Sequence, residues 1–306
     1  MKFKLLYIAL FLSSISFGQQ VISEEVLIKN DSIELPGTLT YSKENTPLII
    51  WIHGSGNIDR NGNQAGVNIK ANYIKQFRDS INKNNIAFFS YDKRSSNKKN
   101  FKHLKGTLFK DFVEDANKVI VHFKNDTRFS EIILIGHSQG SLVAMLASKD
   151  IDKYISLAGP SDSFDKAIVR QITKQSPVFG EAAKAHFKEL LETGTIKEVN
   201  PLLVSVFAKQ NLDFIKNYTK YNPSEEIKKL TVPILIINGT KDLQVKVEDA
   251  QSLHKAAQTS KLVIIKNMNH VLKNIEKDSD NMNSYYSAEF KLSTELITTI
   301  VAFLKK

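Results

Sequence analysis

The sequence predicts an α/β fold in which a mostly parallel central sheet carries helices on both faces. Continuous apolar runs, as at residues 47–52 and 232–237, are typical of strands that are buried on both sides. Segments with helical spacing alternate with these runs, which indicates a parallel sheet covered by helices. With 306 residues, 42% hydrophobic and 24% charged, the chain suits one large domain or a domain with an insertion.

The first half of the chain supplies most of the predicted elements. A β-hairpin with a turn near Asn30 opens the fold, and the strands and helices then alternate. The expected strands span residues 21–28, 32–42, 47–52, 86–91, 132–135 and 154–158, and the expected helices span residues 69–83, 109–123 and 141–147.

The alternation stops at residues 161–228 and resumes after them. Strands are predicted at 232–238 and 262–265, and helices at 247–257 and 286–304. Residues 161–228 have few β-branched runs and much helical pattern, so we expect a helical insertion. It follows the carboxyl end of a strand, where open α/β sheets bind ligands, which favours a cap over a site. The alternative is a set of helices that only covers hydrophobic surface.

The N-terminus has the pattern of a secretory signal peptide over residues 1–18. A basic start at Lys2 and Lys4 precedes an apolar run, and small residues end it at Gly18. A membrane anchor is the alternative, but this run is shorter than the about 20 residues that a spanning helix needs. We therefore expect a mature domain of residues 19–306 that is periplasmic or secreted, without stable membrane insertion.

Composition narrows the partners of the chain. The formal net charge is +10, but the lysines are scattered rather than gathered in a basic stripe with aromatic residues. This distribution argues against a nucleic-acid partner and indicates surface solvation. The chain has no cysteine, which excludes disulfides and a lipid anchor on cysteine.

A G-x-S-x-G motif at residues 136–140 predicts a nucleophilic serine. The motif follows an apolar strand and leads directly into a helix, which is the context that a nucleophile elbow requires. Glycines two residues before and after leave room for Ser138 on a strained turn, and the following helix N-terminus favours developing negative charge. The alternative is a tight structural turn without chemistry.

A serine nucleophile needs a base and an acid that orients it. Of the seven histidines, His270 is the expected base, since it follows the last predicted strand on a loop that can reach the elbow. Asp242 is the expected acid, because it follows the preceding strand; Glu248 and Asp249 are the alternatives. A turn aspartate bound only by local amides, and a loop histidine without a role, are the competing interpretations.

The oxyanion formed by such a serine needs backbone donors already in place. One is expected at Gln139, directly after the nucleophile. The second is expected from the turn at residues 53–56, with Ser55 favoured and Gly56 as the alternative. A flexible turn without this role is the competing interpretation.

No motif points to a metal or a cofactor. H-E-x-x-H, a cysteine cluster, G-x-G-x-x-G and the phosphate-binding P-loop pattern are all absent from the sequence. We therefore expect chemistry without a metal ion and without a cofactor.

With these residues assigned, the chain resembles the α/β-hydrolase superfamily from about residue 30 to its end. The resemblance is carried by HGSG at 53–56, GHSQG at 136–140, VPILIINGTKD at 232–242 and NMNH at 267–270. Within the superfamily the chain is similar to exported bacterial esterases and serine-aminopeptidase-like hydrolases, through GSGNIDRNG at 54–62 and YDKR at 91–94.

This resemblance implies that four charged residues shape the oxyanion loop or the pocket rim without being catalytic: Asp59, Arg60, Asp92 and Arg94. The family's usual glycine after Arg94 is Ser95 here, and the following loop is rich in lysine. That departure puts the shape of this loop in question and leaves the triad unaffected.

The sequence therefore predicts a secreted serine hydrolase, with a carboxylic-ester hydrolase favoured, acting on a small-molecule ester through a Ser-His-Asp triad and an acyl-enzyme. One alternative is an aminopeptidase-like serine peptidase that acts on the ends of short peptides, with Glu181, Glu189 and Glu192 as candidate partners of the substrate's ammonium group. The other alternative is a non-catalytic binding protein of the same fold. The residues that bind the substrate and the oligomeric state are left open by the sequence.

Overall fold

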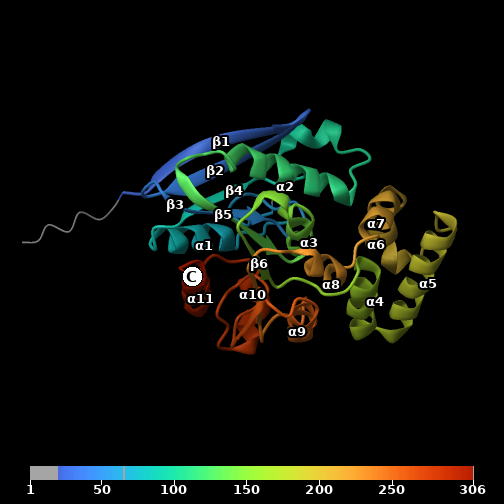
Figure 1. Cartoon of the computed structure of the whole chain (residues 1–306). Coiled ribbons are helices and arrows are strands. Elements are labelled where there is room, and N and C mark those ends of the chain that lie inside the picture. The colour runs from blue at the N-terminus through green and yellow to red at the C-terminus, as the bar shows by residue number, and fades with distance from the viewer. Residues whose placement is uncertain (1–19, 65, 306) are drawn as a thin grey trace, which may run out of the picture.

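A computed structural model describes residues 20–64 and 66–305 of the chain (Figure 1). The predicted signal peptide, residues 1–18, lies outside the described residues. The central sheet has eight strands in the order β1-β2-β4-β3-β5-β6-β7-β8. They are β1 (Ile22–Asn30), β2 (Ile33–Tyr41), β3 (Thr46–Ile52), β4 (Ala87–Tyr91), β5 (Phe129–His137), β6 (Lys153–Leu157), β7 (Ile234–Gly239) and β8 (Lys261–Ile265).

The predicted fold class is confirmed by the pairing of these strands. β2 pairs antiparallel with β1 and β4, and all other neighbours in the sheet pair parallel. Parallel strands end at the same edge of a sheet, so the loops after β3, β5, β7 and β8 meet at one edge. The predicted catalytic residues all lie on these loops.

Helices cover both faces of the sheet. One face packs on α1 (Tyr73–Asn82) and α11 (Thr294–Leu304), and the other packs on α2 (Phe109–Phe123), α3 (Gln139–Leu146) and α9 (Val247–Ala256). In β3, Trp51 belongs to the core of the first face, whereas Ile50 and Ile52 belong to the core of the second. Successive side chains of a strand point to opposite faces, so a strand between two helical layers is apolar at every position.

The segment between β6 and β7 consists of helices with a core of their own. They are α4 (Phe164–Gln175), α5 (Pro177–Thr193), α6 (Val204–Phe207), α7 (Leu212–Tyr218) and α8 (Pro223–Glu226). Phe187, Leu190 and Phe207 lie in a hydrophobic cluster separate from the two sheet cores. In Figure 1, α4 to α7 gather at one side of the molecule, away from β1 and β2.

Short helices complete the described chain. They are α10 (Asn281–Ser284) and the 3₁₀ helices η1 (Lys98–His103), η2 (Ser148–Asp150), η3 (Pro201–Leu203), η4 (Lys209–Asn211), η5 (Ile227–Lys229) and η6 (Asp278–Asp280). None of the helices in this part of the chain has the length and apolar character needed to cross a membrane.

Two helices are shorter than the sequence predicts. The helix expected over residues 69–83 begins at Tyr73, because Asn72 is left-handed at φ 48°. The Asn72 side chain accepts from Asn63 Nδ2 at 2.8 Å, which keeps residues 69–72 in the loop before the helix. The helix expected over 286–304 begins at Thr294, since the Ser293 hydroxyl caps it by accepting from the backbone N–H of Leu296.

Candidate active site

Ser138 occupies a strained turn between β5 and α3. Its backbone has φ 54° and ψ −124°, a conformation that residues other than glycine rarely adopt. The flanking glycines are required sterically: a Cβ on Gly136 would lie 2.4 Å from the Gly140 carbonyl oxygen, and one on Gly140 would lie 2.3 Å from that of Ile52. The turn therefore has the geometry that the G-x-S-x-G motif predicts for a nucleophile elbow.

His270 and Asp242 form a buried pair. His270 Nδ1 lies 2.8 Å from Asp242 Oδ2, and the side chains are 5% and 1% exposed. Asp242 Oδ1 also accepts from the backbone N–H groups of Gln244, at 2.8 Å, and Val245, at 2.9 Å. An ionised carboxylate only accepts hydrogen bonds, so Nδ1 carries the proton and Nε2 of a neutral His270 is free to accept one.

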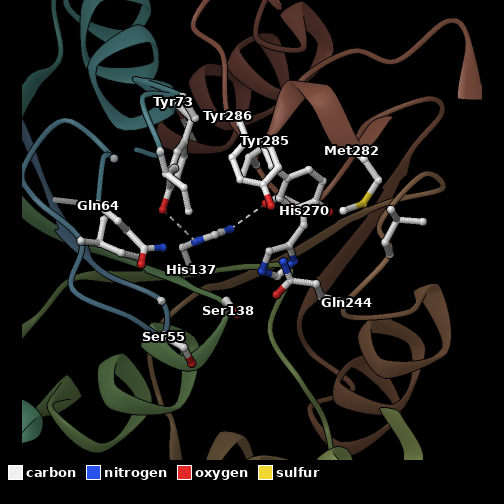
Figure 2. Close-up of a pocket in the computed structure, with 17 residues that line it drawn as sticks. Ser55, Gln64, Tyr73, His137, Ser138, Gln244, His270, Met282, Tyr285 and Tyr286 are labelled. Carbon is white, nitrogen blue, oxygen red and sulfur yellow. Dashed lines mark hydrogen bonds between the residues drawn. The ribbon is translucent and has the colours of Figure 1, made fainter. Parts of the chain in front are cut away.

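Ser138 and His270 line the same cavity, which has a volume of about 310 Å³ (Figure 2). Its wall is mainly aromatic and apolar, and includes Ile58, Ile69, Tyr73, Val271, Tyr285 and Tyr286. Within the described chain, this wall contains no carboxylate side chain and no residue from 161–228. The insertion helices therefore do not form the wall of this cavity. The wall comes from the segments that follow β3, β5, β7 and β8, from the start of α1 and from the segment around α10.

His137 is a site residue to which we assigned no role from the sequence. Its Nε2 lies 2.7 Å from the His270 carbonyl oxygen, and Nδ1 lies 3.5 Å from the Tyr73 hydroxyl (Figure 2, dashed lines). Burial lowers the pKa of His137 to about 3, so the ring is neutral near pH 7 and Nε2–H donates to the carbonyl. This bond fixes the backbone of the loop that carries His270. Its position directly before Ser138 in the motif is the one sequence signal for it.

The two predicted oxyanion residues lie near Ser138, one in the same cavity wall and one next in the chain. Ser55 lines the cavity, and Gln139 is buried at the start of α3. The neighbouring Gly54 passes so close that a Cβ there would lie 3.1 Å from the Ser138 Cβ. Gly56, the alternative to Ser55, is left-handed at φ 94°, and a Cβ on it would meet the Gln64 side chain. The donor role of Ser55 and Gln139 stays a prediction.

The charged residues that the resemblance assigns to the loop are bound to one another, to Asp115 or to backbone. The Arg60 guanidinium holds the Asp92 carboxylate through Nε and Nη2, each at 3.0 Å. Asp59 accepts from the backbone of Asn61 at 2.8 Å, which shapes the loop after β3. Arg94 Nε donates to Asp115 at 2.6 Å. None of these four residues lines the cavity.

The alternative acids are not placed beside His270. Asp249 is buried, and its carboxylate accepts from the Arg170 guanidinium at 2.8 Å and from the Ser161 hydroxyl at 2.9 Å. Glu248 is exposed on α9. Across residues 20–64 and 66–305, no group of histidine and carboxylate side chains has an arrangement that could hold a metal ion.

The chain is similar in sequence to one protein family and to a curated esterase. The family model BD-FAE matches residues 38–257. Esterase EstD of Thermotoga maritima is 25% identical over 249 residues, which cover 78% of this chain and 58% of EstD. The chain thus matches little more than half the length of this curated relative.

Solved structures show the same fold at lower sequence identity. Est1E from Butyrivibrio proteoclasticus has a TM-score of 0.58 at 17% identity, over 92% of this chain and 98% of Est1E. The Pyrococcus furiosus esterase Pf2001 has a TM-score of 0.59 at 17% identity, over 94% of this chain and 91% of Pf2001. An acylaminoacyl peptidase of Pyrococcus horikoshii reaches 0.58 at 14% identity, over 94% of this chain and 41% of the peptidase. With its mostly parallel sheet and its strained strand-to-helix turn at Ser138, the chain has the α/β-hydrolase fold and belongs to the BD-FAE family.

Proposed function

We propose that the chain is a serine hydrolase that cleaves carboxylic esters with Ser138 as nucleophile, His270 as base and Asp242 as orienting acid. The observation that carries this proposal is the buried His270–Asp242 pair, 2.8 Å apart, whose histidine lines the same cavity as Ser138. The three residues come from separate loops at one sheet edge. If Asp242 were only a turn residue, the backbone amides of its own turn would be its partners. Its second carboxylate oxygen instead bonds to a buried histidine.

The proposed reaction follows from the positions of these groups. The Ser138 oxygen attacks the acyl carbon while its proton passes to His270 Nε2, and Asp242 stabilises the imidazolium through Nδ1–H. The backbone N–H groups of Gln139 and Ser55 bind the oxyanion. Collapse of the intermediate breaks the ester C–O bond, and His270 returns the proton to the departing alcohol. Water then cleaves the acyl-enzyme by the same route.

The cavity suits a small ester with an apolar or aromatic group. Its volume of about 310 Å³ and its three tyrosines would bury such a group against ring faces and aliphatic side chains. EstD, the sequence relative, is named as an esterase. Est1E, a structural neighbour at 20% identity and a TM-score of 0.57, has been solved with ferulic acid bound. An apolar or aromatic acyl group is therefore the expected substrate class.

The alternative of an aminopeptidase is less well supported. A substrate ammonium group would need a carboxylate in the pocket, and the described cavity wall contains none. Glu181, Glu189 and Glu192 are all carried by α5, away from the cavity.

A non-catalytic binding protein would have no use for the strained serine turn or for the buried His270–Asp242 pair. Both arguments favour ester hydrolysis.

We also propose that the protein is exported, on the signal-peptide pattern of residues 1–18. Expression of the full chain in a bacterium, followed by fractionation, tests this. The periplasm or medium is expected to contain a protein whose N-terminal residue is Gln19. A full-length N-terminus in every fraction would contradict export by cleavage.

The proposed activity is tested by comparing residues 19–306 with the Ser138→Ala variant. The rate of hydrolysis of p-nitrophenyl acetate, butyrate and octanoate is measured for both proteins. We expect turnover that falls about 10⁴-fold or more in the variant, because the nucleophile is lost. Leucine p-nitroanilide serves as the matched amide substrate. Equal rates in both proteins would refute the serine mechanism, and cleavage of the anilide alone would support the peptidase.

A further inference from the structure

Lys93 is a buried lysine directly behind the proposed oxyanion loop. It follows β4 and is 6% exposed. Its Nζ donates to the Gly54 carbonyl oxygen at 2.8 Å and to Gln139 Oε1 at 3.0 Å. Gly54 precedes Ser55 and Gln139 follows Ser138, so one amine joins the two segments that carry the proposed oxyanion donors.

The charge of Lys93 is not used in an ion pair. Asp115, the carboxylate that acts on it electrostatically, is bound by the Arg94 guanidinium at 2.6 and 2.8 Å. In the part of the chain that the structure describes, no salt bridge to a carboxylate includes Lys93. Its Nζ lies 4.3 Å from the centre of the Phe112 ring, and the adjoining His53 is neutral because burial and Lys93 lower its pKa to about 3.

A buried amine without a counter-ion costs folding free energy, so its retention needs another reason. Burial lowers the pKa of Lys93 to about 7, and the charge of Asp115 opposes this shift. An apolar side chain of the same length would fill the space beside Phe112. However, an apolar side chain could not donate hydrogen bonds to the Gly54 carbonyl and to the Gln139 side chain.

The hydrogen bond from Lys93 to the Gly54 carbonyl also fixes the direction of the Ser55 N–H. In a trans peptide unit, the C=O of one residue and the N–H of the next point in opposite directions. Lys93 does not line the 310 Å³ cavity, whereas Gly54 and Ser55 do. Holding the Gly54 carbonyl toward Lys93 thus directs the Ser55 N–H away from Lys93, to the cavity side. Glycine leaves this peptide unit free to rotate, so a fixed partner is needed.

We propose that Lys93 is a positioning residue that locks the Gly54–Ser55 peptide unit and the Gln139 side chain, so that the two oxyanion donors converge above Ser138. The inference rests on the proposed function. It assigns no contact between Lys93 and the substrate. Its action is through the peptide unit and through Gln139, whose side chain it holds outside the cavity.

Three variants test this proposal. Lys93→Met keeps the length and removes both hydrogen bonds, whereas Lys93→Arg keeps a donor. Lys153→Met removes another buried lysine, which pairs with Glu131 at 2.8 Å at the opposite end of the sheet, and is the matched control. With p-nitrophenyl butyrate, we expect kcat to fall about 100-fold in Lys93→Met, the size of losing one oxyanion donor, while KM stays near the wild-type value. Lys93→Arg should recover part of kcat, and Lys153→Met should keep it.

Hydrogen exchange gives a second readout that does not depend on turnover. The peptide that covers residues 54–58 should exchange its amide hydrogens faster in Lys93→Met than in the wild type. In Lys153→Met, its exchange rate should equal that of the wild type. If the methionine variant does not fold, Lys93→Gln, which is too short to reach both oxygens, provides the same comparison. Wild-type kcat in the Lys93 variant, or unchanged exchange at 54–58, would overturn the proposal. If the wild type hydrolyses no ester, the proposed function is refuted. The hydrogen-exchange result would then still decide whether Lys93 holds the 54–58 segment in place.

Discussion

Asp242 illustrates how much a single side chain in this site does. One carboxylate oxygen accepts from His270 and the other accepts from two backbone amides of its own turn. Its position could be predicted, because it directly follows a strand whose end lies at the same edge as Ser138. The roles of His137 and Lys93 could not be predicted in this way. His137 acts on a residue 133 positions away, and only the folded chain shows that contact.

Asp242→Asn is expected to lower kcat about 10⁴-fold, since the amide no longer selects the His270 tautomer with the proton on Nδ1. Thermal unfolding should change little, because the side-chain oxygen still accepts from the turn amides. Asp278→Asn, at a carboxylate that is 82% exposed near the same loop, is the control and should retain kcat. Comparable activity in the two variants would remove Asp242 from the triad.

His137→Phe is expected to lower kcat about 5- to 10-fold with a smaller effect on KM. The variant keeps a ring against Trp51 and loses the hydrogen bond to the His270 carbonyl, which contributes about 1 kcal/mol. Steady-state kinetics on one ester measure this loss. An unchanged kcat would show that the bond does not help to place His270.

Among the elements, the starts of α1 and α11 depend on contacts that sequence periodicity does not report. Residues 69–72 have helical spacing, but the Asn63–Asn72 bonds keep them in the loop that lines the cavity. Lys273 ties the loops before both helices together: its Nζ donates to the Ala71 carbonyl at 3.1 Å, to the Phe290 carbonyl at 2.8 Å, and to Gln76. Such a bond between distant loops overrides local propensity.

Lys273 predicts a pH dependence of stability. Burial lowers its pKa from 10.5 to about 8, so between these pH values the unfolded chain binds more protons than the folded chain. The free energy of unfolding should therefore rise with pH over this window, by up to about 3 kcal/mol for this group. The contribution of Lys273 is isolated by denaturant unfolding of the wild type and of Lys273→Met between pH 8 and pH 10. All other titratable groups are the same in the two proteins, so their contributions cancel in the difference. A difference between the two proteins that does not vary with pH would contradict the prediction.

At the scale of the whole molecule, the order of strands and helices was predictable, whereas the position of the insertion was not. The strand runs are apolar because both faces are covered, and this pattern is visible in the sequence. The insertion has its own core and contacts α9 through Arg170 and Asp249, a contact that no local pattern encodes. The cavity wall comes instead from loops and from α10, a short helix that the sequence did not predict.

Asp249→Ala should loosen the insertion from the sheet. It removes the acceptor for Ser161 and Arg170, and we expect a loss of about 2 kcal/mol of unfolding free energy, since Asp249 is buried while Arg170 is partly exposed. Hydrogen exchange should become faster in α4. Wild-type stability together with unchanged exchange in α4 would show that this pair does not anchor the insertion.

Ser138 is the proposed nucleophile, and covalent labelling of the reactive serine identifies it. The protein from Gln19 onward is treated with a fluorophosphonate, digested, and the labelled peptide is identified by mass spectrometry. We predict one adduct, on Ser138, that forms much more slowly in His270→Ala and is absent in Ser138→Ala. A label on another residue, or equal labelling of Ser138→Ala, would contradict a nucleophilic Ser138.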